Sequence, residues 1–142
     1  MADRTDHSKS LTGIWNGLYT YPAEVRMPES HFVATLFDGG VFLSGTIHEN
    51  MQRGDGTAIP ANAAVDGTRD GNHVAFIKSY DGLSGLGHSV HYVGTLAEDG
   101  DEIEGQWHIH TRRGDLFSGR FLMIRTRGKR AAVETEAFEH AR

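Results

Sequence analysis

The chain of 142 residues has no cysteine, only three prolines and no long uninterrupted hydrophobic run. Without cysteine it cannot form disulfides, thiolate metal sites or a cysteine nucleophile. No stretch approaches the roughly 20 apolar residues that a membrane-spanning helix needs. The first ten residues are polar and lack the apolar segment of a secretory signal. We therefore expect a soluble, cytoplasmic protein with no membrane partner.

Basic residues are also scarce, because 14 lysines and arginines stand against 19 aspartates and glutamates, for a net charge of −5. Proteins that hold nucleic acid by neutralising phosphates generally need a basic surface, so we expect no nucleic-acid partner. Glycine, in contrast, is abundant, with 18 residues. So many glycines beside so few prolines favour tight turns over long helices. A chain of this length is expected to form one domain around one core.

Alternating patterns predict strands along most of the chain. The clearest example is Glu102 to His110, where Ile103, Trp107 and Ile109 alternate with polar residues. Two segments lack such a pattern: residues 49–60 are predicted to be an exposed loop, and residues 81–87 a flexible connection. Eight strands are predicted in all, over residues 11–21, 31–37, 41–49, 63–68, 73–80, 88–96, 102–110 and 116–125.

These predicted strands are joined by short connections, with no helical pattern between them. Sequential strands joined in this way form an antiparallel meander, and a meander of eight tends to close because closure removes the two exposed edges. The expected fold class is therefore all-β, a closed eight-stranded antiparallel up-and-down β-barrel. We assign residues 11–125 to the barrel, residues 1–10 to a flexible N-terminal arm, and residues 126–142 to a charged tail that is disordered or a frayed helix.

The start of the first strand, Gly13-x-Trp15, resembles the first-strand signature of the calycins, the barrel superfamily of lipocalins, fatty-acid-binding proteins and avidins. The longer segment from Gly13 to Pro22 also resembles that of a group of uncharacterised bacterial proteins. The resemblance implies a barrel with the tryptophan plugging one end, and it implies fold more than function, because this class hosts many activities. Four strand motifs are more similar to the avidin-like than to the lipocalin-like version: Leu43-Ser-Gly-Thr46, Val93-Gly-Thr95, Ile103-Glu-Gly-Gln-Trp107 and Phe117-Ser-Gly-Arg-Phe121.

Aromatic residues provide the candidate binding site. Rings with a few polar tips are common in ligand sites, although they can also simply fill a small barrel. Lys78 and Tyr80 share a strand face with Phe76, so Lys78 is either an inward charge that needs a partner or a sign that this face is outside. The predicted ligand-binding residues are Trp15, Tyr19, Tyr21, Phe76, Lys78, Tyr80, Tyr92 and Trp107.

Nine histidines raise the question of a metal site. His108 and His110 lie two apart on one face of a strand, which is a workable ligand spacing. That face is opposite Trp107, so an inward tryptophan would place both histidines outside. No paired-carboxylate or Glu-Xaa-Xaa-His pattern reinforces the pair, and we predict no metal site. The sequence identifies no cofactor.

The leading hypothesis is a non-enzymatic binding module that accepts a small, mostly apolar ligand at the barrel mouth, beside residues 80–87 and 49–60. The alternative is a structural or interaction module that forms a homo-oligomer through its outer surface. A third hypothesis is an enzyme that uses Lys78, Tyr80 or a histidine as acid or base, but no spacing selects a reaction. The homo-oligomer hypothesis depends on apolar residues predicted to point outward: Phe42, Ile77, Val93, Leu122 and Ile124.

Overall fold

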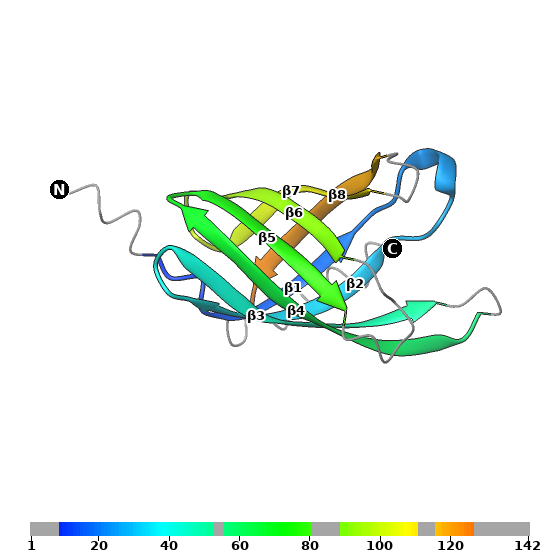
Figure 1. The fold of residues 1–142 in the computed structure, drawn as a ribbon, viewed down its shortest axis with the longest axis horizontal. Helices are drawn as coiled ribbons and strands as arrows, with labels where there is room; N and C mark the ends of the chain where they lie inside the picture. Colours follow the sequence, from blue (N-terminus) through cyan, green and yellow to red (C-terminus); the bar gives the residue numbers. More distant parts are fainter. Residues whose placement is uncertain (1–8, 53–55, 81–88, 111–115, 127–142) are drawn as a thin grey trace.

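The computed structural model describes residues 9–52, 56–80, 89–110 and 116–126 (Figure 1). It is a closed barrel in which each strand pairs with its neighbours in sequence and β1 pairs with β8. The predicted eight-stranded antiparallel up-and-down barrel is thus confirmed. The strands are β1 (Gly13–Tyr19), β2 (Ser30–Asp38), β3 (Phe42–Gln52), β4 (Ala58–Asp70), β5 (His73–Tyr80), β6 (Ser89–Leu96), β7 (Glu102–His110) and β8 (Leu116–Arg125).

One short 3-10 helix, η1 (Ala23–Val25), lies between β1 and β2. Within the described part of the chain, no helix has the length and apolar character needed to cross a bilayer. The predicted tail, apart from Thr126, and residues 1–8 of the predicted arm lie outside the described residues.

Side chains alternate between the interior and the outer surface along each strand. In β5, Val74, Phe76 and Lys78 are buried, and the residues between them are exposed. In β7, Ile103 and Trp107 are buried as the sequence pattern predicts. The core is therefore the barrel interior, filled by one face of every strand.

Glycines on the inner face allow neighbouring strands to approach closely. A Cβ atom on Gly105 would lie 2.0 Å from the carbonyl oxygen of Val93 on β6. At Gly17 the ring of Phe32 occupies the place of a side chain, with its Cζ atom 2.1 Å from where a Cβ would be. These positions explain why glycine occurs in the middle of strands, where it would otherwise be unfavourable.

The predicted loop over residues 49–60 is wrong, because most of it is strand. β3 continues to Gln52 and β4 begins at Ala58, so the two form a hairpin that extends past the barrel (Figure 1). Pro60 pairs with Asn50 in this hairpin. Among the described residues β4 pairs with β5 only from Ala63 onward, so Pro60 lies on an edge, where a missing N–H donor is tolerated.

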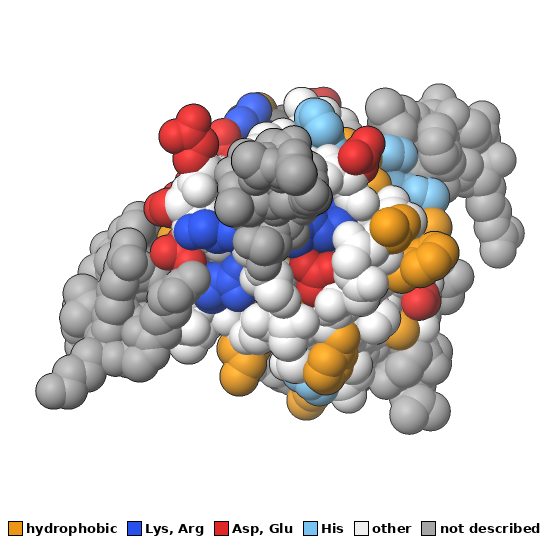
Figure 2. Space-filling view, turned by 90° about the vertical axis from the view of Figure 1, so that its left-hand side faces the viewer, with side chains coloured by type: hydrophobic (Ala, Val, Ile, Leu, Met, Phe, Trp, Pro, Cys, Tyr) orange, Lys and Arg blue, Asp and Glu red, His pale blue; other side chains and the backbone are white. Residues whose placement is uncertain are grey.

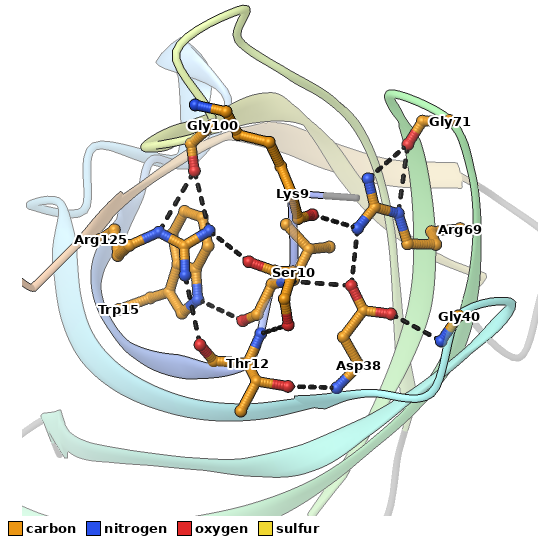
Figure 3. Close-up of polar contacts among 11 residues, drawn as sticks. Lys9, Ser10, Thr12, Trp15, Asp38, Gly40, Arg69, Gly71, Gly100 and Arg125 are labelled. Carbon is orange, nitrogen blue, oxygen red and sulfur yellow. Dashed lines mark hydrogen bonds and ion pairs between the residues drawn. The ribbon is translucent and has the colours of Figure 1, made fainter. Parts of the chain in front are cut away.

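One end of the barrel is closed by residues 9–12, which precede β1. Leu11 is fully buried, and its backbone N–H donates to Asp38 at 2.9 Å. Asp38 also forms an ion pair with Arg69 at 2.6 Å (Figure 3). Arg69 in turn donates to the carbonyl oxygen of Lys9 at 2.7 Å. The segment is therefore fixed to β2 and β4 by charge-assisted hydrogen bonds.

Arg125, the last residue of β8, connects the same segment to the opposite wall. Its guanidinium carbon lies 4.5 Å from the ring centroid of Trp15, and it donates to the carbonyl oxygens of Ser10 and Gly100. Trp15 donates from Nε1 to the carbonyl oxygen of Leu11 at 2.9 Å. Figure 2 shows this end of the molecule, with basic and acidic side chains gathered at its centre. Access to the interior is therefore expected at the other end, which we call the open end.

Candidate functional site

An inward-facing glutamate occupies the interior near the open end. Glu49 follows Leu43 and Ile47 on the inner face of β3, and its side chain is only 1% exposed. Glu49 was not among the predicted site residues, because it was expected at the start of a loop. The signal was nonetheless present, since extending the alternation of Leu43 and Ile47 by two residues puts Glu49 inside.

Lys78 on β5 is the partner of this carboxylate. Its Nζ atom lies 3.3 Å from Oε2 of Glu49, and its side chain is also 1% exposed. Of the two interpretations left open by the sequence, Lys78 is thus the inward charge with a partner. Two opposite charges held together out of water leave the interior neutral overall.

Two tyrosine hydroxyls also hold the carboxylate. Tyr19 on β1 donates to Oε1 of Glu49 at 3.0 Å, and Tyr80 on β5 donates to Oε2 at 2.6 Å. With Lys78, the carboxylate therefore has three donors from two strands on different sides of the barrel. Hydrogen bonds to a charged acceptor are shorter and stronger than neutral ones, so this arrangement fixes the carboxylate in place.

Aromatic rings surround the ammonium group of Lys78. Its Nζ atom lies 4.8 Å from the ring centroids of both Tyr19 and Tyr80, and 5.4 Å from that of Tyr92. All three distances fall within the range of cation–π attraction. Tyr92 in turn stacks on Phe76, with the ring centroids 4.8 Å apart. Lys78 therefore lies in an aromatic cage that Glu49 completes.

Burial changes the acid–base behaviour of this cluster. It lowers the pKa of Lys78, although the nearby charge of Glu49 acts in the opposite direction. Burial, together with the charge of Glu49, raises the pKa values of Tyr19 and Tyr80 well above their usual range. Burial also raises the pKa of Tyr92. Tyr19 and Tyr80 consequently remain protonated and act as donors at any physiological pH.

A second group of aromatic rings packs beside this cluster, in contact with Tyr19. Tyr21 packs edge-on against Trp107, with the ring centroids 5.8 Å apart, and Trp107 packs against Phe117 at 5.6 Å. Trp107 is buried and donates to the carbonyl oxygen of Thr20 at 2.9 Å. Tyr21, Phe117 and Ile109 are only partly buried. Among the described residues, this end of the barrel therefore carries apolar side chains that are partly exposed.

The structure brings seven of the eight predicted binding residues together. Trp15 differs, because it lies at the closed end beneath Arg125. Whether the others bind a ligand remains a prediction. The predicted mouth segment over residues 81–87 lies outside the described residues. The seven are Tyr19, Tyr21, Phe76, Lys78, Tyr80, Tyr92 and Trp107.

The histidines of the outer surface do not form a larger cluster in the described part of the chain. His108 faces away from the interior and stacks on His91 of β6, with ring centroids 5.1 Å apart. The side chain of His110 lies outside the described residues. No three histidine, aspartate or glutamate side chains gather at one point among the residues that the structure describes.

Comparisons with known proteins support the β-barrel fold and identify no family. No protein-family model matches the chain, and no curated protein matches it. Among solved structures, a de novo designed fluorescence-activating β-barrel matches with a TM-score of 0.50 and 16% identity. The match covers 84% of this chain and 97% of the designed chain. Lobster apocrustacyanin A1 matches with a TM-score of 0.41 and 14% identity. That match covers 96% of this chain and 71% of the apocrustacyanin chain.

Proposed function

We propose that this protein binds one small, mostly apolar molecule through the open end of its barrel. The polar end of the ligand would meet the cluster of Glu49, Lys78, Tyr19 and Tyr80. The observation that carries the proposal is the ion pair of Glu49 and Lys78, whose side chains are both 1% exposed inside the barrel. Burying two charges costs more than packing apolar side chains of the same size, so stability alone does not explain the pair.

The dimensions and lining of the barrel support this proposal. Eight strands enclose an interior that side chains can fill or that can hold one small ligand. The partly exposed rings of Tyr21 and Phe117 provide an apolar entrance to the buried cluster. A designed barrel of the same fold is fluorescence-activating, which is an analogy at the level of the fold.

Native mass spectrometry of gently purified protein is the first test. We expect an extra mass of a small molecule that leaves on denaturation. If the protein carries no such mass, a titration with anilinonaphthalene sulfonate follows, a fluorophore with an apolar body and one anionic group, and we expect saturable binding to the folded chain. Absence of both a retained molecule and saturable binding would reject the proposal.

A matched pair of substitutions localises the binding. Phe117→Ala removes a partly buried ring at the open end, whereas Phe42→Ala removes a ring that is 74% exposed on the outer surface. We expect Phe117→Ala to weaken fluorophore binding about tenfold, since a buried aromatic contact contributes on the order of 1.5–3 kcal/mol. Phe42→Ala should leave the affinity unchanged. Equal effects of the two substitutions would place the fluorophore on the outer surface.

Homo-oligomer formation is a second candidate function, and exposed apolar residues on the outer surface favour it. Phe42 and Val93 are 74% and 55% exposed, and they belong to one row across the sheet with Thr68 and Ala75. Ile77 on β5 is 37% exposed. Leu122 and Ile124, also predicted to point outward, are half-buried. An apolar row of this kind fits a second apolar surface.

Light scattering at increasing protein concentration tests this second function. An oligomer that Phe42→Ser dissociates would support it. A monomer at every concentration would reject it without affecting the proposal of ligand binding.

A further inference from the structure

We propose that Lys78 binds small aldehydes or ketones covalently, as a reversible imine, so that the ligand of the open end is a carbonyl compound with an apolar body. This inference rests on the proposed function, since it names the ligand class of the same site. It is carried by the position of Lys78, which is 1% exposed, within reach of a fixed carboxylate and surrounded by rings.

The geometry supplies what an imine-forming lysine needs. The amine must be held out of water, because water competes for the carbonyl compound and reverses the reaction. The rings of Tyr19, Tyr80 and Tyr92 provide an apolar wall against which the body of the ligand can pack. Glu49 provides a base and acid 3.3 Å from the nitrogen.

The step balances without an oxidant or a reductant. Glu49 takes a proton from the Lys78 ammonium, and the freed lone pair attacks the carbonyl carbon while the C=O π electrons move to oxygen. Glu49 returns the proton to that oxygen. It then moves a second proton from nitrogen to the hydroxyl, which leaves as water. The products are a protonated imine, paired with the Glu49 carboxylate, and one water molecule.

The same surroundings favour both the neutral amine that reacts and the protonated imine that forms. Burial lowers the pKa of Lys78, which increases the fraction of neutral amine at neutral pH. The protonated imine keeps the positive charge of the ammonium at the same place. It therefore retains the carboxylate and the aromatic faces as partners.

Borohydride trapping tests the inference, and the chain offers an internal comparison. The sequence contains only three lysines, Lys9, Lys78 and Lys129, and Lys9 is exposed at the closed end. The full chain is incubated with benzaldehyde and cyanoborohydride at neutral pH, and the modified lysines are identified by peptide mass spectrometry. We expect Lys78 to be labelled about tenfold faster than Lys9 despite its burial. Labelling of Lys9 at a higher or equal rate would overturn the inference.

Benzyl alcohol separates this inference from the proposed function, because it has the same apolar body without a carbonyl. Binding of the alcohol without imine formation at Lys78 would overturn the inference and leave the binding function intact. Binding of neither compound would count against both. As a matched control, Lys78→Arg keeps the positive charge but cannot form an imine, and we expect it to lose the benzaldehyde adduct at this position. An adduct of the same stoichiometry in the arginine variant would also overturn the inference.

Discussion

Glu49 and Lys78 depend on each other more than any ordinary surface pair does. Both side chains are almost completely removed from water, and each is the neutralising partner of the other. Exposed ion pairs contribute on the order of 0–1 kcal/mol, whereas removing one partner of a buried pair leaves an uncompensated charge and costs about 3–5 kcal/mol. The effects of changing these two residues are therefore expected to be strongly non-additive.

A double-mutant cycle measures this dependence. We expect Lys78→Met alone to lower the free energy of unfolding by about 3 kcal/mol, because it leaves the Glu49 carboxylate buried without its cation. Adding Glu49→Gln should recover at least half of that loss. Urea unfolding of the two single variants, the double variant and the wild type provides the four values. A double variant that loses the sum of the single losses would contradict the coupling.

The tyrosines of the same cluster predict how the protein responds to alkali. The pKa values of Tyr19, Tyr80 and Tyr92 are raised above that of an unfolded tyrosine, about 10. Above that pH the folded state keeps protons that the unfolded state loses, so these groups make stability fall as the pH rises. The lowered pKa of Lys78 has the opposite effect on the pH dependence of stability. Because three tyrosines oppose this single lysine, we expect a net loss of stability in alkali.

Tyrosinate absorbance and circular dichroism, followed together against pH, test this expectation. Most of the tyrosinate signal should appear in the same transition in which the strand signal is lost. Ionisation of Tyr19, Tyr80 and Tyr92 near the ordinary tyrosine pKa with the barrel intact would contradict the expectation and show that the interior is open to water.

Individual strands were predictable where alternation was strong, and the errors occurred where it was weak. β7 was predicted at its observed bounds because apolar and polar residues alternate along its whole length. The ends of β3 and β4 were missed because residues 50–60 show no clear alternation of apolar and polar residues and include Pro60. Alternation does not mark the part of β4 that leaves the barrel, since none of residues 58–60 is buried.

Close strand contacts predict the effect of adding one methyl group to β7. Gly105→Ala would place a Cβ atom 2.0 Å from a backbone oxygen of β6, so the strands must separate locally. We expect a loss of about 1–3 kcal/mol in thermal or urea unfolding. Gly39→Ala is the matched control, because its Cβ would meet its nearest neighbour at 3.4 Å. Similar losses at both positions would mean that close approach of the strands does not determine the cost.

At the scale of the whole molecule, the closed barrel was predictable and its site only in part. Eight alternating segments with short connections leave few arrangements other than a meander, and closure follows from the removal of edges. Seven of the predicted binding residues do lie together, because β1, β5, β6 and β7 direct six of them into the interior and Tyr21 follows directly on β1. The position of Lys78 relative to Glu49 was not predictable, since register across β4 decides it and a single sequence does not show that register.

Closure also predicts slow folding. β1 and β8 are the first and last of the described strands, and they pair along Trp15 to Tyr19 and Phe121 to Arg125. Pairing of distant segments requires loop closure before any contact is gained, so proteins dominated by such pairs fold in milliseconds to seconds. Stopped-flow refolding from urea should fall in this range. Complete refolding within microseconds would contradict it.

The chain contains two tryptophans, and the fold places one at each end of the barrel. Trp15 is fully buried under the guanidinium of Arg125, and Trp107 lies among the rings at the open end. Each end of the barrel therefore carries its own fluorescent reporter. In a Trp15→Phe variant the remaining emission comes from Trp107 and reports on the open end alone. In a Trp107→Phe variant it comes from Trp15 and reports on the closed end. The order in which the two ends open during unfolding can thus be followed by intrinsic tryptophan fluorescence, without any attached dye.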